Sequence, residues 1–94
     1  MTHTKTGHFK TPNASKYLQQ LCKHFAHKVE VRYDPTSAEV AFPMGHAVLK
    51  ADDTRLEAVV TGGSEDEAIR AQGIIDSHLV RFAFREDFVR MDWG

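Results

Sequence analysis

The segment at residues 17–28, YLQQLCKHFAHK, carries its apolar residues at the spacing of an α-helix. With about 100° between successive residues, steps of three and four place those residues on one side. The predicted buried side holds five residues: Leu18, Leu21, Cys22, Phe25 and Val29. The predicted polar side holds Tyr17, Gln20, His24 and His27. The segment therefore predicts a helix that packs on a core and exposes two histidines.

Four short segments after this helix alternate between apolar and polar residues, which indicates half-buried strands. They cover residues 29–33, 38–42, 46–51 and 56–61. The breaks between them are rich in Asp, Pro, Ser, Thr and Gly, which favour turns. Because no helix separates these strands, we predict an antiparallel meander.

The first helix follows a short predicted strand at residues 6–10. Its start has two alternatives. Either Thr11 caps the helix with Pro12 at the first helical position, or Asn13 caps it directly.

A second helix begins at Ser64, which together with Glu67 forms a capping-box pattern. Acidic residues in the first turn also suit the positive end of the helix dipole. The predicted core stripe holds Ala68, Ala71, Ile75, Leu79, Phe82 and Ala83. We expect this helix to end near Phe84 and a closing strand to follow at residues 88–93.

These elements predict an α+β fold in the order β-α-β-β-β-β-α-β. We expect a two-layer sandwich in which a curved antiparallel sheet carries both helices on one face. The order resembles half of the TATA-binding-protein-like architecture, an analogy of fold that transfers no function. Residues 1–94 have neither a linker nor a repeat, so we expect one domain.

Composition narrows the class of protein. Hydrophobic residues make up 41% of the chain and charged residues 27%, as in ordinary globular proteins. A formal net charge of −1 gives no overall field for nucleic acid or an anionic membrane, so we expect neither as a partner. One cysteine cannot form an internal disulfide. Without a signal-like or membrane-spanning segment, the expected location is the cytoplasm.

The first helix offers the best candidates for binding chemistry. His24 and His27 are three residues apart, so their imidazoles could share a metal ion. Alternatively, they form a solvated basic patch with Lys23 and Lys28. Cys22 lies about 140° or more around the helix from either histidine, so we interpret it as a core residue.

The second helix carries His78, Arg81 and Arg85 on one stripe. Arginines in this arrangement could hold a small anion by bidentate hydrogen bonds. Alternatively, they pair with the nearby acidic residues, which are Asp76, Glu86 and Asp87. If the helices lie side by side, His78 could join His24 and His27 as a third ligand to iron or zinc.

Motifs for common enzyme classes are absent from the sequence, including a phosphate loop, a nucleophile elbow and a zinc-protease signature. A metal-assisted enzyme would need a general base, for which only Glu86 or Asp87 is near. We therefore predict no catalytic residues. His46, at a strand start, is expected to face solvent, and a role in a site is the less favoured alternative. His3 and His8 are expected to lie in or near a mobile terminus and are given no role.

Two segments, YLQQLCKHFAHK and HLVRFAFREDF, together with the meander and the late tryptophan, resemble the bacterial family called domain of unknown function 2218. The resemblance spans about residues 6–93. The positions typical of the family are Leu21, Cys22, His24, His27, His78, Arg81, Phe82, Phe84, Arg85 and Trp93. The family has no established activity. Some relatives are linked to siderophore-interacting flavoproteins, which implies a possible partner in iron metabolism.

Taken together, these patterns predict a non-catalytic accessory protein that binds a metal or a small anion between its helices. The predicted site is lined by His24, His27, His78, Arg81 and Arg85. The alternative is a homodimeric interaction module without a small-molecule site, using Val59, Phe88 or the exposed sheet face.

Overall fold

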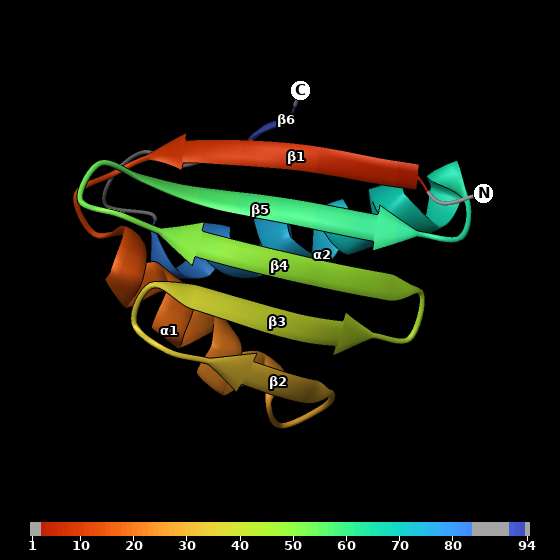
Figure 1. The fold of residues 1–94 in the computed structure, drawn as a ribbon, viewed down its shortest axis with the longest axis horizontal. Helices are drawn as coiled ribbons and strands as arrows, with labels where there is room; N and C mark the ends of the chain where they lie inside the picture. The colour runs from red at the N-terminus through yellow and green to blue at the C-terminus, as the bar shows by residue number, and fades with distance from the viewer. Residues whose placement is uncertain (1–2, 84–90, 94) are drawn as a thin grey trace.

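The computed structural model describes residues 3–83 and 91–93. Its elements follow the order β1 (His3–Lys10), α1 (Ala14–Phe25), β2 (Glu30–Tyr33), β3 (Ser37–Phe42), β4 (Gly45–Ala51), β5 (Arg55–Gly62), α2 (Glu65–Phe82) and β6 (Asp92–Trp93). The described strands form one antiparallel sheet in the order β2-β3-β4-β5-β1-β6. Figure 1 shows both helices on the same face of this sheet, which confirms the predicted α+β sandwich. The other face, which we call the open face, carries none of the described helices.

Alternation within the strands decides which side chains reach the core. In β3, β4 and β5, every second residue is buried beneath the helices. The register also places small residues beside large ones. For example, Leu49 of β4 lies between Ala38 of β3 and Ala58 of β5. Such a row leaves room above each alanine for helix side chains. The meander and its facing are therefore as predicted.

Two aspartates stabilise two turns of the meander, Asp34 between β2 and β3 and Asp52 between β4 and β5. Asp34 Oδ1 accepts hydrogen bonds from the backbone N–H groups of Thr36 and Ser37, both at 2.8 Å. Asp52 Oδ1 does the same for Thr54 and Arg55, also at 2.8 Å. Because these bonds favour the ionised form, they lower the pKa of both carboxyl groups.

The prediction for the polar side of α1 is wrong at Tyr17, which is only 4% exposed. Its ring stacks on Phe9 of β1, with 6.0 Å between ring centroids. The periodicity of α1 cannot reveal this burial because the covering residue comes from a strand. The last three residues of the predicted polar side, Gln20, His24 and His27, are half-buried or exposed.

Helix α1 begins after Asn13, which supports the second of the two predicted starts in position only. Asn13 does not cap the helix with its side chain, and its backbone lacks the extended conformation of a typical cap. Instead, Thr11 Oγ1 accepts a hydrogen bond from Asn13 N at 3.1 Å. Helix α2 starts as predicted, since Glu67 N donates to Ser64 Oγ at 3.2 Å. It ends at Phe82 rather than near Phe84.

The C-terminal segment is fixed to α2 by Asp76. Its two oxygens accept from Met91 N at 2.9 Å and from Trp93 Nε1 at 2.8 Å. Trp93 in turn covers Gly7 of β1, where an added Cβ would lie 2.8 Å from the indole ring. Asp76 therefore holds the end of the chain, and none of the described arginines forms an ion pair with it. Strand β6 contains the last part of the predicted closing strand, and residues 88–90 lie outside the described residues.

Candidate functional site

His24 and His78 lie side by side between the helices. Their ring centroids are 4.6 Å apart, with His24 in the last turn of α1 and His78 in the last part of α2. Both side chains are half-buried. The approach of these two histidines, expected from the sequence, is therefore present in the fold.

Aromatic rings surround the histidine pair. Phe25 meets His78 edge-on at 5.1 Å between centroids, and Phe82 meets His24 at 6.5 Å. Phe25 also packs against Phe42 of β3 at 5.1 Å. These contacts connect the two imidazoles to the core and limit the orientations that they can adopt.

A hydrogen bond fixes the protonation pattern of His78. Its Nδ1 lies 2.7 Å from the carbonyl oxygen of Ile74, one helical turn earlier. Because a carbonyl can only accept, Nδ1 carries the proton and donates it. Nε2 is then the nitrogen left to take up a proton or to bind a ligand.

Five basic side chains gather at this point, and we call them the basic cluster: His24, His27, Lys28, His78 and Arg81. Burial lowers the pKa of His24 most, and the positive charges of the other four members lower it further. The described residues include three ion-paired contacts, all outside the cluster. The cluster therefore has no described carboxylate to neutralise it.

Helix dipoles offset only part of this charge. His24 and Arg81 occupy the last turns of α1 and α2, where the negative end of a helix favours a cation. Each dipole end amounts to roughly half an elementary charge. Lys28 and Arg81 alone carry two full charges, which is more than the two dipole ends offset.

The other two members of the predicted site are His27, at the edge of the basic cluster, and Arg85. His27 is exposed just beyond the end of α1, and Arg85 lies outside the described residues. Within residues 3–83 and 91–93, no three His, Cys, Asp or Glu side chains are grouped so that they could hold a metal. The structure thus brings His24 and His78 together without adding His27, and the three-histidine metal site stays a prediction.

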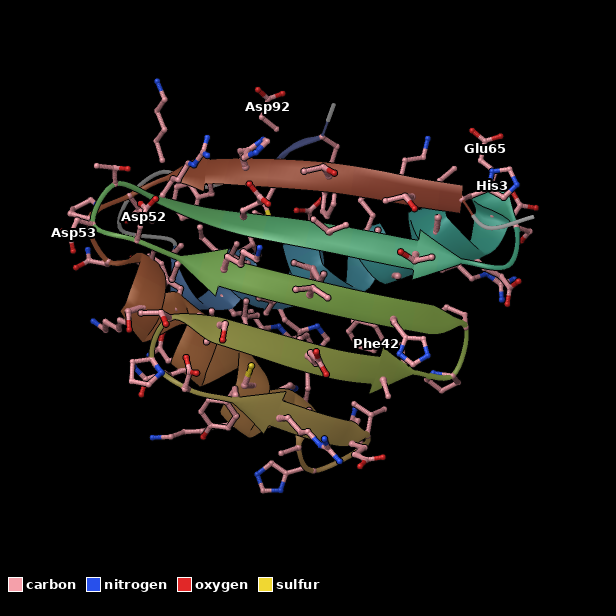
Figure 2. All side chains as sticks on the ribbon, in the orientation of Figure 1. His3, Phe42, Asp52, Asp53, Glu65 and Asp92 are labelled. Carbon is pink, nitrogen blue, oxygen red and sulfur yellow. The ribbon has the colours of Figure 1, made fainter. Side chains whose placement is uncertain are left out.

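The sequence analysis missed a cavity of about 370 Å³ beside the histidine pair. It lies between the end of α1, the turn from β3 to β4, and α2. Its lining consists of Phe25, Lys28, Val29, Phe42, Pro43, Met44, Ile74 and His78. Figure 2 labels Phe42, which reaches this cavity from β3. The signal in the sequence was the pair Pro43 and Met44, two apolar residues in a predicted turn that line the cavity.

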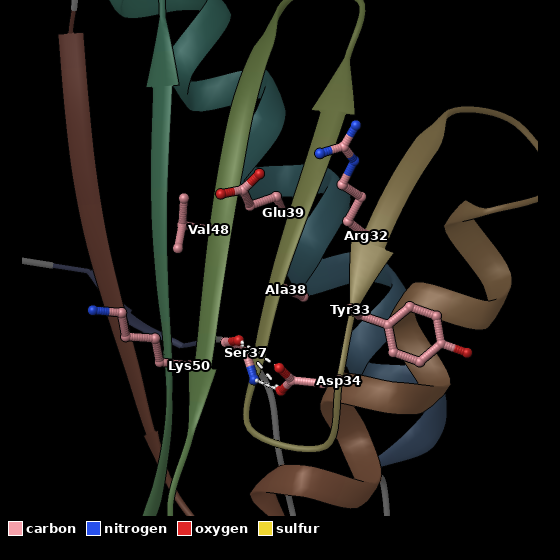
Figure 3. A pocket seen from close by; sticks show the side chains of 8 residues that line it. All are labelled: Arg32, Tyr33, Asp34, Ser37, Ala38, Glu39, Val48 and Lys50. Carbon is pink, nitrogen blue, oxygen red and sulfur yellow. Dashed lines mark hydrogen bonds between the residues drawn. The ribbon is translucent and has the colours of Figure 1, made fainter.

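A larger hollow of about 550 Å³ lies on the open face near β2. Figure 3 shows its charged lining, which contains both signs: Arg32 and Lys50 against Asp34 and Glu39. Asp34 is already bonded within its turn. With its charges balanced, this hollow offers no preference for a charged ligand.

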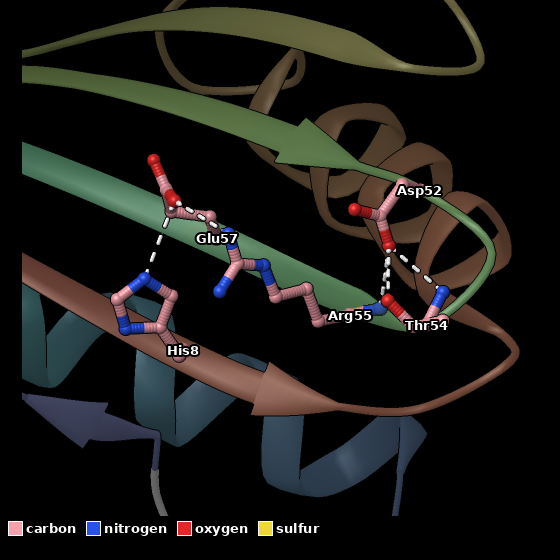
Figure 4. Close-up of polar contacts among 5 residues, drawn as sticks. All are labelled: His8, Asp52, Thr54, Arg55 and Glu57. Atoms are coloured by element: carbon pink, nitrogen blue, oxygen red, sulfur yellow. Dashed lines mark hydrogen bonds and ion pairs between the residues drawn. The ribbon is translucent and has the colours of Figure 1, made fainter.

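His8 on the open face contacts a carboxylate (Figure 4). Its Nε2 lies 3.2 Å from Glu57 Oε2, and Arg55 reaches the same oxygen at 3.9 Å. We call these three residues the open-face trio. Two basic groups here share one carboxylate, in contrast to the basic cluster.

Cys22 is fully buried in the core, as predicted. Burial raises the pKa of its thiol to about 11, because a thiolate would lose its hydration. The reactive thiolate is therefore scarce near neutral pH. This property argues against Cys22 as a nucleophile.

Comparisons with known proteins agree with the fold. A family model described as "Uncharacterized protein conserved in bacteria (DUF2218)" matches residues 6–94. The chain belongs to this family. It is also similar to the NMR structure of PA4090 from Pseudomonas aeruginosa, with 27% identity and a TM-score of 0.81. That match covers 97% of this chain and 94% of the other.

The comparison with curated proteins gives no match. Among the helices that the structure describes, none has both the length and the apolar character needed to cross a membrane. The family is confirmed by these findings, and its description assigns no activity to any residue of the chain.

Proposed function

We propose that this DUF2218 protein is a non-catalytic binding protein whose basic cluster holds a small anion. The observation that supports the proposal is the gathering of His24, Lys28, His78 and Arg81 without a described carboxylate. Like charges in one place cost stability unless an opposite charge joins them. A bound anion supplies that charge.

Histidine protonation links this binding to pH. Burial, and after it the basic groups nearby, lower the pKa of His24 and favour its neutral form. A bound anion favours the protonated imidazoles, which then donate charge-assisted hydrogen bonds. At His78, Nδ1 is already bonded to the Ile74 carbonyl, which leaves Nε2 for contact with the anion. Anion affinity should therefore rise as the pH falls from 7.5 toward 6.

The test is calorimetric titration with inorganic phosphate at pH 6.5. Wild-type protein should bind one phosphate, and His24→Gln and His78→Gln should each weaken binding by about tenfold, as expected for a lost charge-assisted bond. His46→Gln removes an exposed imidazole from the open face and serves as the matched control. Equal binding by all four proteins would contradict the proposal.

A second candidate function is binding of iron or zinc at the same histidine pair. The bond from His78 Nδ1 to the Ile74 carbonyl favours it, because metal-bound imidazoles usually donate their other N–H in this way. A third ligand would have to come from His27, from a residue outside the described ones, or from outside the chain. Zinc that binds at one equivalent and is lost in His78→Gln would support this candidate over the anion.

The homodimer and the association with a siderophore-interacting flavoprotein are wider proposals. The homodimer draws support from Val48, which is 37% exposed and lies opposite Val59 on the open face. Sedimentation over a range of concentrations tests it, with Val48→Lys as the variant that should stay monomeric. A wild-type monomer at high micromolar concentration would remove this proposal.

A further inference from the structure

The cavity beside the basic cluster has the composition of a site for an amphipathic ligand. Six of its eight lining residues are apolar and the remaining two, Lys28 and His78, are basic. At about 370 Å³ it lies at the small end of the range for small-molecule sites, about 300–1,000 Å³. A short acyl chain or a single ring suits this volume.

Lys28 and His78 belong to both the cavity and the basic cluster. An anionic group held by these two residues would therefore have the apolar cavity directly next to it. Phe25 and Phe42 are buried in the lining, while Val29, Met44 and Ile74 are half-buried and carry the rest of the apolar surface. Met44 lies in a turn, and its flexible thioether can adapt to ligands of different shape.

We propose that the ligand is a small monocarboxylate with an apolar body, such as a medium-chain acid. Its carboxylate would lie at Lys28 and His78, and its apolar body would fill the cavity. The inference rests on the proposed function, since it names the class of anion that the cluster takes. A lysine beside an imidazole matches the single charge of a carboxylate.

Chain length is the first test. Affinity measured by calorimetry should rise from acetate through butanoate and hexanoate to octanoate, by up to about fourfold for each added CH₂ that enters the cavity. Octanol, which lacks the charge, should bind at least about tenfold more weakly than octanoate. Equal affinity for acetate and octanoate would overturn the inference, and so would octanol binding as tightly as octanoate.

Filling the cavity is the second test. Met44→Trp should lower octanoate affinity about tenfold, the loss expected when the apolar contact area is no longer available, and should leave acetate unchanged. Ile69→Trp is the matched control, because Ile69 is 48% exposed on α2 and lies outside the cavity lining. Equal octanoate binding by the two variants would overturn the inference. The chain-length series keeps it testable if Met44→Trp does not fold.

The outcomes separate this inference from the proposed function. If phosphate binds but octanoate binds no more tightly than acetate, the cavity inference alone fails. If phosphate does not bind, the proposed anion site fails. Lys28→Gln should weaken both phosphate and octanoate, and unchanged octanoate binding by this variant would overturn the placement of the carboxylate.

Discussion

The two sides of the sheet treat their basic residues differently. On the open face, His8 and Arg55 share the carboxylate of Glu57, and the open-face trio is close to charge balance. On the helix side, His24 and His78 lie 4.6 Å apart among further positive groups, with no described acidic partner. The comparison teaches that this fold balances a basic group with a neighbouring acid on the open face, whereas the described residues at the helix ends include no such acid.

On the helix side, the folded chain makes protonation of His24 unfavourable. Burial and, after it, neighbouring basic groups lower the pKa of His24, which means that protonation of His24 is less favourable in the folded chain than in the unfolded chain. Sites that bind charged ligands commonly keep such perturbed groups. The difference between the two sides is therefore the basis for placing a ligand at the helix ends.

The largest expected effect comes from giving the helix side its own acid. His24→Glu places a carboxylate beside His78 and Arg81, as Glu57 lies beside His8 on the open face. A like charge next to a bound anion costs several kcal/mol, so phosphate affinity should fall by at least about 100-fold. Calorimetry measures the loss, and binding within about threefold of His24→Gln would show that charge is not the determinant.

The second effect concerns stability in acid, where the turns of the sheet should respond in a lower pH range than the helix side. The pKa of Asp34 and Asp52 is lowered from 3.8 in the folded chain, so their contribution to stability is complete above pH 3.8. It is lost as the pH falls below 3.8 through the folded values. Asn at both positions keeps an accepting oxygen but does not titrate. Urea unfolding of Asp34→Asn/Asp52→Asn should therefore show a shallower loss of stability below pH 4.

The helix side should respond nearer to neutral pH. Because the pKa of His24 is lowered from 6.5, the unfolded chain binds more protons at this residue as the pH falls below 6.5. The stability of the wild-type protein without ligand should then decrease from pH 7 to pH 5. The His24→Gln variant should lose less stability over the same pH range. Urea midpoints at these two pH values provide the measurement. An equal decrease in wild type and variant would remove the electrostatic account of His24.

The smallest effect is expected on the open face. Glu57→Gln leaves His8 and Arg55 without their carboxylate, but these side chains are 40% and 50% exposed. A pair so exposed contributes little, so the free energy of unfolding should change by less than about 1 kcal/mol. Phosphate affinity should stay at the wild-type value. A change of several kcal/mol would mean that the open-face trio does more than balance surface charge.

The sequence predicted most of the fold because its signals are local. Alternation within β3, β4 and β5 and the capping box at Ser64 each depend on residues close in the chain. Tyr17 was assigned to the wrong side because Phe9, which covers it, lies in another element. The partners of Asp76 were missed for the same reason, since Met91 and Trp93 are distant along the chain.

The candidate site was predicted in part. His24 and His78 were named from helical spacing, and their meeting follows from two helices packed on one sheet face. The apolar turn residues Pro43 and Met44 signal only one wall of the cavity, and the rest was not predicted because it comes from α1, α2 and the end of β3. Arg85 lies outside the described residues, and its place in the site stays a prediction.

The most direct test of the central claim is the pKa of His24, measured by NMR from its imidazole signals with and without phosphate. We predict a low pKa in the free protein, because burial and the surrounding positive charges both lower it. Saturating phosphate should raise this pKa and leave the signals of His46 unchanged. A pKa of His24 that does not move with phosphate would contradict the account.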